Sequence, residues 1–451
     1  MNCEQPNPKH QEVIFIGEIV SQDTQSIGQS SKIIDYYQIA LNLIDKYQII
    51  SFEETIYYYR DGIYKPIGVS INKEIQQTLL IRGLTAKASI TEPVRQIQRY
   101  IINETGIDEY PFNTSTNLIP VENGVIKIEY DTGEIGLIDH SPNYRFSYKL
   151  PIVYDPNEND GSIMQYLESL GCNIDMLLQI PAHTLLSNLN KNYKKAYLLK
   201  GRGNSGKTTY LTLLNQYFFG GDNCSNIPLQ ALMNERFKPA GLVGKIANIA
   251  DELSKIKLGD VAKFKEITGG GKITIERKFE HPYSYQNRAV LIFATNEYPP
   301  IDEVDDAFWA RWEIIEFTKS FNVDPLFEER TFTQKNLSSF LNLVIKRMRE
   351  ILNEGSLARG KSVDEIKQIW LYDSDSVYKF KESILIKDIH NTIVKQELFT
   401  MYEGYCEANQ LTPKYLKEFS QRMQSFGALD VQVDKGNGRF RCFKGFNVRT
   451  K

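Results

Sequence analysis

The sequence predicts an α/β fold built around buried strands. Three short apolar runs of strand character lie near the middle of the chain: AYLLK before a glycine-rich loop, KIANIA before two acids, and AVLIFAT before an asparagine. Apolar runs of this length that alternate with helical segments are typical of strands covered on both faces. In such folds, polar groups that follow the strands are the first candidates for a functional site.

Composition indicates a globular protein with more than one domain. The chain has 451 residues, of which 41% are hydrophobic and 24% charged. The formal charge is 53 − 56 = −3, so any contact with DNA has to be local. Five widely spaced cysteines without a CxxC pair argue against a zinc module and a disulfide framework. We find no leader pattern and no apolar stretch that could cross a bilayer, so we expect no membrane partner and a cytosolic location.

Two regions precede the central segment. Residues 1–35 are polar and rich in Gln and Ser, so we expect a flexible tail. Residues 36–160 predict an α+β domain, because helical spacing alternates there with β-rich runs. The dipeptides DG at 61–62 and NG at 123–124 are turn signals of hairpins. A structural or docking role and direct contact with DNA are both open for this domain.

A glycine-rich loop follows the first apolar strand and precedes an amphipathic helix. Residues 201–208 read GRGNSGKT and fit the P-loop pattern GxxxxGK[ST]. Backbone N–H groups of such a loop surround phosphates, and the helix beginning at Lys207 directs the positive end of its dipole toward them. We expect Lys207 to bind the β- and γ-phosphates of ATP and the Thr208 hydroxyl to bind Mg²⁺; the alternative is an ordinary glycine turn. The predicted ATP-binding residues are Gly201, Arg202, Gly203, Asn204, Ser205, Gly206, Lys207, Thr208 and Thr209.

Two acids end the second strand. Asp251 can hold Mg²⁺ through water, and Glu252 can orient and deprotonate an attacking water molecule. The alternative is that the pair only caps the next helix. The P-loop upstream favours the catalytic interpretation.

The third strand ends in Asn296, a polar side chain where an apolar one would continue the core. We expect it to hold the lytic water and to sense the γ-phosphate. Arg311 follows 311 − 296 = 15 residues later and is a candidate arginine finger, because its charge is permanent and can stabilise a phosphoryl transition state. The alternative is an ion pair with Asp305 or Asp306.

The four motifs, in this order and spacing, resemble the superfamily 3 helicase domain of the phage/plasmid primase–helicase family, a branch of the AAA+ ATPases. GNSGKTTYLTLL, NIPLQALMNERFKPAGLVGKIANIADEL, FKEITGGGKITIERKFEHPYSYQNRAVLIFATNEYPP and DDAFWARWEIIEF carry the resemblance. Upstream, NGVIKIEYDTGEI and HSPNYRFSYKLPIVYDP resemble the domain that precedes the helicase in that family. The implied fold is an AAA+ P-loop core at 161–345 with a C-terminal domain at 346–451.

The resemblance implies a homo-oligomeric ring, a hexamer, with ATP bound between subunits. Arg311 would then act on the nucleotide of the neighbouring subunit. The family usually has two arginines in this motif, and Ala310 stands in the first place here. Lys194 and Lys195, before the P-loop strand, are further candidates for a contact from the neighbour.

The family also places a β-hairpin with a lysine and an aromatic residue near its tip in the pore of the ring. KITIERKFEHPYSYQ is the corresponding segment, with Lys278 and Phe279 as the residues that would contact single-stranded DNA. A lysine can bind a phosphate and an aromatic ring can contact a sugar or base. A solvated charged hairpin without a ligand is the alternative.

The C-terminal region predicts helices followed by a basic hairpin, a pattern that favours a winged-helix-like domain. Helix signals lie in NTIVKQELFTMYEGYCEANQL and in TPKYLKEFSQRMQSFGAL, the second with Thr412 and Pro413 at its start. Duplex origin DNA and another protein are equally open as its partner. The hairpin would present basic residues: Lys435, Arg439, Arg441 and Lys444.

The function implied is that of an ATP-dependent replicative DNA helicase of a virus or plasmid, moving 3′ to 5′ on single-stranded DNA in the host cell cytosol. The first alternative is an origin-binding initiator that uses ATP only as a switch; an intact hydrolytic set argues against it. The second is a DNA-packaging or RNA-directed motor. We do not interpret Asp373-Ser374-Asp375 as a polymerase site, so a primase or polymerase would have to be a separate partner.

Overall fold

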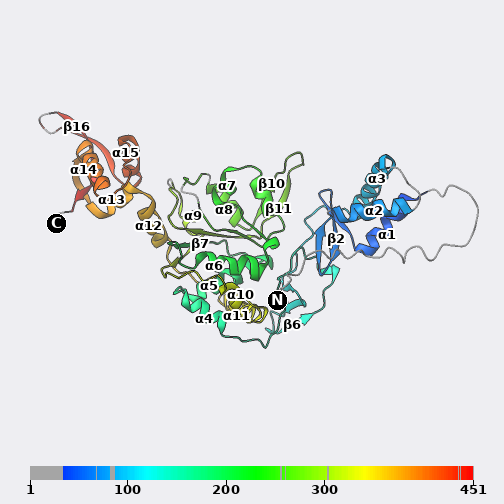
Figure 1. The fold of residues 1–451 in the computed structure, drawn as a ribbon. Coiled ribbons are helices and arrows are strands. Elements are labelled where there is room, and N and C mark those ends of the chain that lie inside the picture. The colour runs from blue at the N-terminus through cyan, green and yellow to red at the C-terminus, as the bar shows by residue number, and fades with distance from the viewer. Residues whose placement is uncertain are drawn as a thin grey trace, which may run out of the picture.

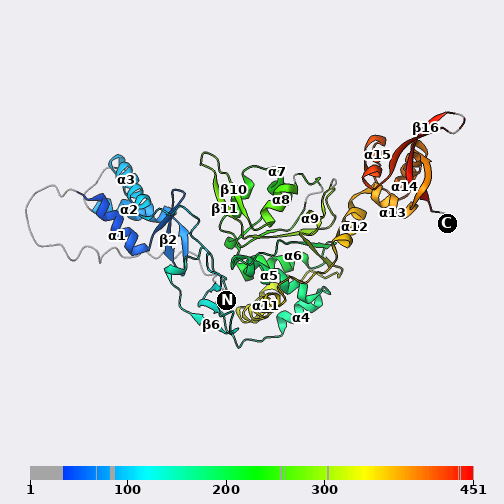
Figure 2. The same cartoon turned by 180° about the vertical axis from the view of Figure 1, so that it is seen from behind.

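The computed structural model describes residues 34–67, 69–81, 87–253, 256–259, 261–301, 304–434, 436 and 438–449. Residues 1–33 of the predicted tail, and Lys435 of the predicted basic hairpin, lie outside them. The described chain forms an elongated molecule with the N-terminal helices at one end, a large sheet in the middle and the C-terminal elements at the other end (Figures 1 and 2).

The N-terminal part contains two small antiparallel sheets and three helices. The turn at Asp61-Gly62 has positive φ at both residues, 54° and 85°, and joins two paired strands, so the hairpin predicted there is present. The hairpin predicted at the NG dipeptide 123–124 is also present, but its turn consists of Glu122 and Asn123, because Gly124 already pairs with Val121. The elements are α1 (Tyr36–Tyr47), β1 (Ile50–Phe52), β2 (Thr55–Arg60), β3 (Ile63–Pro66), α2 (Val69–Ile81), α3 (Lys87–Thr105), β4 (Leu118–Val121), β5 (Gly124–Ile128), β6 (Ile135–Ile138) and η2 (Pro142–Tyr144).

A five-stranded parallel sheet forms the centre of the molecule. Its order is β13-β7-β12-β9-β8, so the first strand in the chain lies between the fourth and the fifth, and all carboxyl ends lie at one edge. The strands are almost wholly buried, as a parallel sheet covered on both faces requires. They are β7 (Ala196–Gly201), β8 (Cys224–Ser225), β9 (Ala247–Ala250), β12 (Val290–Thr295) and β13 (Trp312–Phe317).

Side chains of the strands alternate between two hydrophobic clusters, one on each face of the sheet. Tyr197 and Leu199 face the first cluster, whereas Leu198 faces the second. Helices before β7, directly after β7 and after β13 cover the first face: α4 (Ser162–Ser169), α5 (Ile174–Asn188), α6 (Lys207–Thr212), η3 (Leu213–Phe219), α10 (Phe327–Thr331) and α11 (Gln334–Glu354). The second face is covered by α7 (Leu229–Asn234), η5 (Lys238–Leu242), α8 (Val261–Thr268), α9 (Asp306–Trp309) and α12 (Val363–Ser374).

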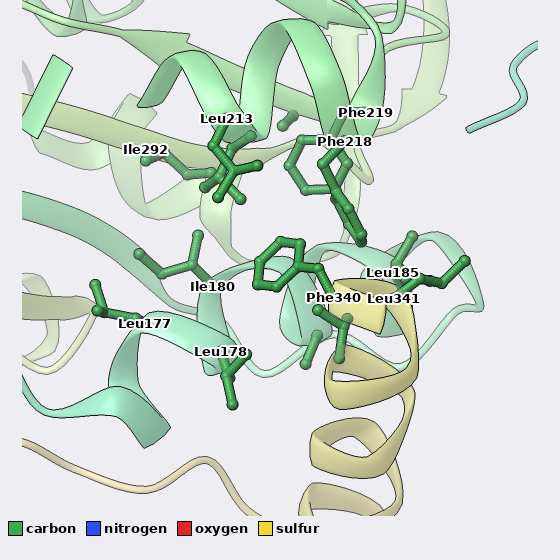
Figure 3. Packing of buried hydrophobic residues seen from close by; sticks show 14 of the residues in the cluster. Leu177, Leu178, Ile180, Leu185, Leu213, Phe218, Phe219, Ile292, Phe340 and Leu341 are labelled. Atoms are coloured by element: carbon green, nitrogen blue, oxygen red, sulfur yellow. The ribbon is translucent and has the colours of Figure 1, made fainter. Parts of the chain in front are cut away.

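Aromatic packing fixes the first face. Phe218 of η3 packs against Phe340 of α11 with ring centroids 5.0 Å apart, and Ile180 of α5 lies in the same cluster (Figure 3). Burial of each such side chain contributes roughly 1.5–3 kcal/mol. This packing holds α6, and with it the loop before α6, against the sheet. The short η4 (Gly221–Asn223) follows η3.

A two-stranded hairpin extends from the elements that cover the second face of the sheet. Strands β10 (Lys272–Ile275) and β11 (Tyr283–Gln286) pair antiparallel, with Lys272 opposite Gln286, and project from the body (Figure 1). The predicted hairpin is therefore present.

The C-terminal elements have their own hydrophobic core and a three-stranded antiparallel sheet of order β14-β16-β15. The second predicted helix begins at Leu416, not at Thr412 and Pro413, because the Tyr402 hydroxyl accepts the N–H of Lys414 at 2.9 Å and holds this segment outside the helix. The first begins at Lys395, since the preceding four residues belong to a strand. The elements are α13 (Ser376–Ile384), β14 (Leu385–Val394), α14 (Lys395–Ala408), α15 (Leu416–Ser425), β15 (Leu429–Asp434) and β16 (Arg439–Val448).

Candidate nucleotide-binding site

The glycine-rich loop connects the carboxyl end of β7 directly to α6. Asn204 and Gly206 have φ values of 58° and 90°, in the left-handed region that favours glycine and asparagine. A Cβ atom on Gly201 would lie 2.5 Å from the Phe317 carbonyl oxygen, so that position has no room for a side chain. The local sequence therefore sets the tight loop that a P-loop needs, and the helix starts at Lys207 as predicted.

The loop forms one wall of a cleft of about 340 Å³ at the carboxyl ends of the strands. The opposite wall comes from the residues after β9 and β12. Most of the predicted site residues meet here, whereas Gly201 and Arg202 do not belong to the lining. The lining consists of Gly203, Asn204, Ser205, Gly206, Lys207, Thr208, Thr209, Asp251, Glu252, Thr295 and Asn296.

Lys207 is 7% exposed, and its ammonium group contacts only neutral oxygens. Its Nζ donates to the carbonyls of Gly201 (2.6 Å) and Arg202 (2.8 Å), and contacts Ser205 Oγ (3.2 Å) and Asn296 Oδ1 (3.1 Å). Within the described residues no carboxylate lies within 4.0 Å of it. Burial lowers the pKa of Lys207, and the charge of Lys200 lowers it further. A buried cation without a counter-ion attracts an anion such as a phosphate.

The two acids after β9 lie at the exposed side of the cleft. The N–H of Leu253 donates to the Ala294 carbonyl of β12 at 3.0 Å, which ties this segment to the neighbouring strand. In the described part of the chain the next helix is α8, which begins at Val261, so Asp251 and Glu252 do not cap it directly. Among the described residues neither carboxylate forms an ion pair, and both line the cleft.

The oxygen donors needed for Mg²⁺ line the same cleft: the Thr208 hydroxyl and the Asp251 carboxylate. Across the described residues no group of three or more His, Cys, Asp or Glu side chains could form a metal cage. Mg²⁺ that is bound with a nucleotide needs no such cage, because phosphates and water complete its six ligands. The donor set therefore fits Mg²⁺ that arrives with ATP.

A second cavity, of about 350 Å³, adjoins the P-loop and was not expected from the sequence. Asn204, Gly206 and Thr209 belong to its lining as well as to that of the cleft. The Asn204 carbonyl accepts the N–H of Phe321 at 2.9 Å, which fixes the segment after β13 beside the loop. Its other side chains are largely apolar and include Tyr166, Leu170, Phe321, Val323 and Phe327.

Arg311 lies far from this cleft. It precedes β13, and its carbonyl accepts the N–H of Ala196 at 2.7 Å, at the amino end of β7. Six residues of strand, roughly 20 Å, separate that end from the register pair of Phe317 and Gly201. This distance exceeds the reach of an arginine side chain, so Arg311 cannot contact a nucleotide in the cleft of its own subunit.

The ion pair considered for Arg311 is not formed with Asp305 or Asp306 among the described residues. Its guanidinium instead donates to the carbonyls of Ala307 (2.5 Å) and Lys265 (3.4 Å). Asp305 pairs with the Lys265 side chain at 2.7 Å. Burial lowers the pKa of Arg311, and the nearby Asp305 charge opposes that effect.

The two lysines before β7 lie at the same amino end. Lys195 is paired with Glu313 at 2.6 Å, and both side chains are almost fully buried, at 11% and 1% exposure. Lys195 therefore has its charge neutralised within its own subunit, which argues against a contact with a neighbour's nucleotide. Lys194 has a left-handed φ of 56° and carries no such pair among the described residues.

The hairpin tip carries the two residues predicted to contact DNA. Phe279 is fully exposed and has a φ of 67°, a conformation that is costly for an aromatic residue. Lys278 is exposed beside it. Arg277 and Glu280 form an ion pair across the tip at 3.4 Å. An exposed aromatic ring on a projecting hairpin is the feature that the DNA-binding prediction requires.

None of the helices in the described ranges is long and apolar enough to span a membrane.

Two family models match separate parts of the chain. Residues 199–311 match a family described only as a family of unknown function (DUF5906), and residues 372–442 match a family described as poxvirus D5 protein-like. Two African swine fever virus proteins named "Putative primase C962R", from the Warthog/Namibia and Pig/Kenya isolates, are 22% and 21% identical over 373 residues. That match covers 75% of this chain but only 38% of the viral proteins, so it does not assign the named activity to the shared part.

Among solved structures, two of the NrS-1 C-terminal region without ligand are similar over most of both chains. One covers 93% of this chain and 100% of its own, with 14% identity and a TM-score of 0.43. The other covers 91% and 98%, with 15% identity and a TM-score of 0.41. At these scores the likeness adds nothing to the site's interpretation. The poxvirus D5-like match and the viral relatives support a relationship between this chain and a viral primase–helicase family.

Proposed function

We propose that this chain is the ATP-hydrolysing subunit of a ring-shaped DNA helicase that serves the replication of a virus or plasmid. The observation that carries the proposal is the cleft at the carboxyl ends of β7, β9 and β12. It combines a buried, unpaired Lys207 with two acids and the Asn296 amide. This set matches what phosphoryl transfer from ATP to water requires: a phosphate-binding cation, a metal ligand, a base and a group that orients water.

Each residue would act at a defined point of the reaction. Lys207 would exchange its carbonyl partners for the β- and γ-phosphates, and Thr208 with Asp251 would hold Mg²⁺, which neutralises developing charge on the phosphates. Asn296 would orient the attacking water and Glu252 would accept its proton. The adjoining cavity has apolar and aromatic walls suited to the adenosine part of ATP.

Arg311 would complete the site of a neighbouring subunit. Its place at the opposite end of the sheet excludes a role in its own cleft, as argued above, which supports the ring assembly implied by the sequence. Lys278 and Phe279 at the hairpin tip would contact single-stranded DNA in the pore, with 3′-to-5′ movement inferred from the superfamily.

The C-terminal elements support a further contact with duplex DNA. Their order, helix–strand–helix–helix–strand–strand, is that of a winged helix. Arg439 and Arg441 are exposed on β16, whereas Lys444 is half-buried. An origin-binding initiator that uses ATP only as a switch is therefore the second candidate. A separate primase or polymerase partner belongs to either version, and the host cytosol is the proposed location.

The deciding experiment compares ATP hydrolysis and strand separation, with and without single-stranded DNA, for the wild type and for Lys207→Ala. We expect DNA-stimulated turnover in the wild type and its loss in the variant. Adding Arg311→Ala subunits to the wild type should lower the rate more than in proportion, because each one disables a neighbour's site. Lys335→Ala and Arg95→Ala are matched controls, since both side chains are exposed and remote from the cleft.

ATP binding without hydrolysis, in the presence of DNA, would reject the motor and leave the initiator. Inhibition strictly in proportion to the added Arg311→Ala subunits would reject the role of Arg311 in a neighbouring site.

A further inference from the structure

Lys200, at the end of β7, links two segments that are far apart in the sequence. Its Nζ donates to the carbonyl oxygen of Asn296 at 2.8 Å and to the Asp373 carboxylate of α12 at 2.5 Å. It also lies 4.4 Å from the centroid of the Tyr298 ring. The same Asp373 oxygen accepts the N–H of Tyr298 at 3.3 Å. The pair therefore holds both ends of the backbone between Asn296 and Tyr298.

Asn296 is consequently fixed by two lysines. Lys207 contacts its side-chain oxygen at 3.1 Å, and Lys200 holds its backbone oxygen. A phosphate bound to Lys207 would compete with the Asn296 side-chain oxygen for the ammonium group, whereas the contact from Lys200 would remain. The direction of the amide toward the cleft would then depend on Lys200 and on its partner Asp373.

The helix that carries Asp373 is itself firmly placed. Trp370, one turn earlier in α12, is fully buried and donates its indole N–H to the Pro299 carbonyl at 2.9 Å. Its ring packs on Tyr298 with centroids 4.9 Å apart. Asp373 therefore lies on a helix that packs firmly on the segment that it holds, although its own side chain is 40% exposed.

We propose that Lys200 and Asp373 are positioning residues for the Asn296 amide, so that α12 contributes to catalysis without touching ATP. This inference rests on the proposed ATP hydrolysis. The Lys200 and Asp373 side chains are 19% and 40% exposed, and a pair at that exposure adds little to stability. A small misplacement of a catalytic group, in contrast, can lower a rate by a hundredfold. The pair should therefore affect turnover much more than folding.

The test measures kcat, nucleotide affinity and thermal stability for Lys200→Met, Asp373→Asn and the double variant. We expect each single variant to lower kcat about tenfold, with ATP affinity within about twofold of the wild type and an almost unchanged melting temperature. The double variant should be no slower than the worse single one, because both remove one contact. Lys200→Arg should recover most of kcat, since a cavity of about 510 Å³ beside Lys200 has room for the guanidinium.

Lys335→Met is the matched control, because Lys335 pairs with Asp160 at 3.4 Å in the same subunit but far from Asn296. A wild-type kcat in Lys200→Met or Asp373→Asn would overturn the inference, as would a loss confined to nucleotide affinity or to melting temperature. These outcomes leave the proposed function intact when the wild type hydrolyses ATP and Lys207→Ala does not. Absence of turnover in the wild type itself would reject both.

Discussion

The two ends of the central sheet use charge in opposite ways. At the amino end, Lys195 and Glu313 form a buried ion pair, and the Arg311 guanidinium donates to two carbonyls. At the carboxyl end, Lys200 pairs with the partly exposed Asp373, but the equally buried Lys207 has no carboxylate partner among the described residues, and Asp251 and Glu252 are exposed. The buried Lys195–Glu313 pair is satisfied within the subunit and indicates a structural role, whereas the buried Lys207 ammonium without a counter-ion indicates a place for an anionic ligand.

The largest effect of a substitution is expected at the amino end of the central sheet, as a loss of stability. Glu313→Ala would leave the Lys195 ammonium buried without a partner, which costs about 3–5 kcal/mol of unfolding free energy. Urea unfolding would measure the loss, with Glu129→Ala as the control, because the Lys127–Glu129 pair at 2.6 Å is about half exposed and is worth at most about 1 kcal/mol. Equal losses in the two variants would contradict the structural role of the buried pair.

A substitution at the carboxyl end of the sheet should change the rate of ATP hydrolysis and leave the stability of the fold unaltered. Glu252→Gln keeps the size of the side chain but removes its basicity, so we expect kcat for ATP hydrolysis to fall about a hundredfold. Nucleotide binding and the melting temperature should stay near their wild-type values, since Glu252 is exposed. Unchanged turnover in this variant would remove Glu252 from the reaction.

A pH dependence of stability should follow from His183, which contacts β7 from α5. Burial, and then the charge of Lys195, lower its pKa from 6.5 to about 3, and its Nδ1 lies 3.1 Å from the Tyr197 hydroxyl. Between these two pH values the unfolded chain binds the proton and the native protein does not. This group alone should therefore lower the unfolding free energy by roughly 1.4 kcal/mol for each pH unit below 6.5, until about pH 3.

The measurement is the urea midpoint as a function of pH. His183→Gln cannot take up the proton, so its curve should be flatter over this range. Parallel curves for the two proteins would show that His183 does not carry the effect.

The smallest effect is expected at the hairpin tip, outside both ends of the sheet. Phe279→Ala removes a fully exposed ring, so we expect no loss of stability. Affinity for single-stranded DNA should fall about fivefold to tenfold, which corresponds to roughly 1–1.4 kcal/mol of lost base stacking. Fluorescence anisotropy with a labelled oligonucleotide measures this affinity. Phe237→Ala is the control, because Phe237 is a partly exposed ring outside the hairpin. Unaltered affinity would favour the solvated hairpin.

The sequence predicts those parts of the candidate site whose residues lie close together in the chain. The P-loop and the start of α6 follow from glycine placement and the helix dipole within a short segment, and the family resemblance located the β10–β11 hairpin. The meeting of Asp251 and Asn296 with the loop could also be expected, because parallel strands bring their carboxyl ends together.

Other features of the candidate site could be found only once the order of the strands in the sheet was known. The aromatic cavity beside the P-loop joins Tyr166 to Phe321, two residues with no common sequence pattern, and exists only because β13 lies next to β7. The distance of Arg311 from the cleft depends on the same pairing. The Lys200–Asp373 contact spans 173 residues, and the sequence predicts only a polar helix start at Asp373, whereas this residue lies near the end of α12.

The placement of the P-loop and Arg311 at opposite ends of one sheet determines how many complete ATP sites an assembly of subunits contains. If the arginine completes a neighbour's site, every subunit carries two halves that can never join each other. An open row of n subunits then contains n − 1 complete sites, and closing the row adds the last one without any new type of contact. Specific activity should therefore rise with protein concentration and then level off at closure, and a covalently linked closed ring should lose that dependence.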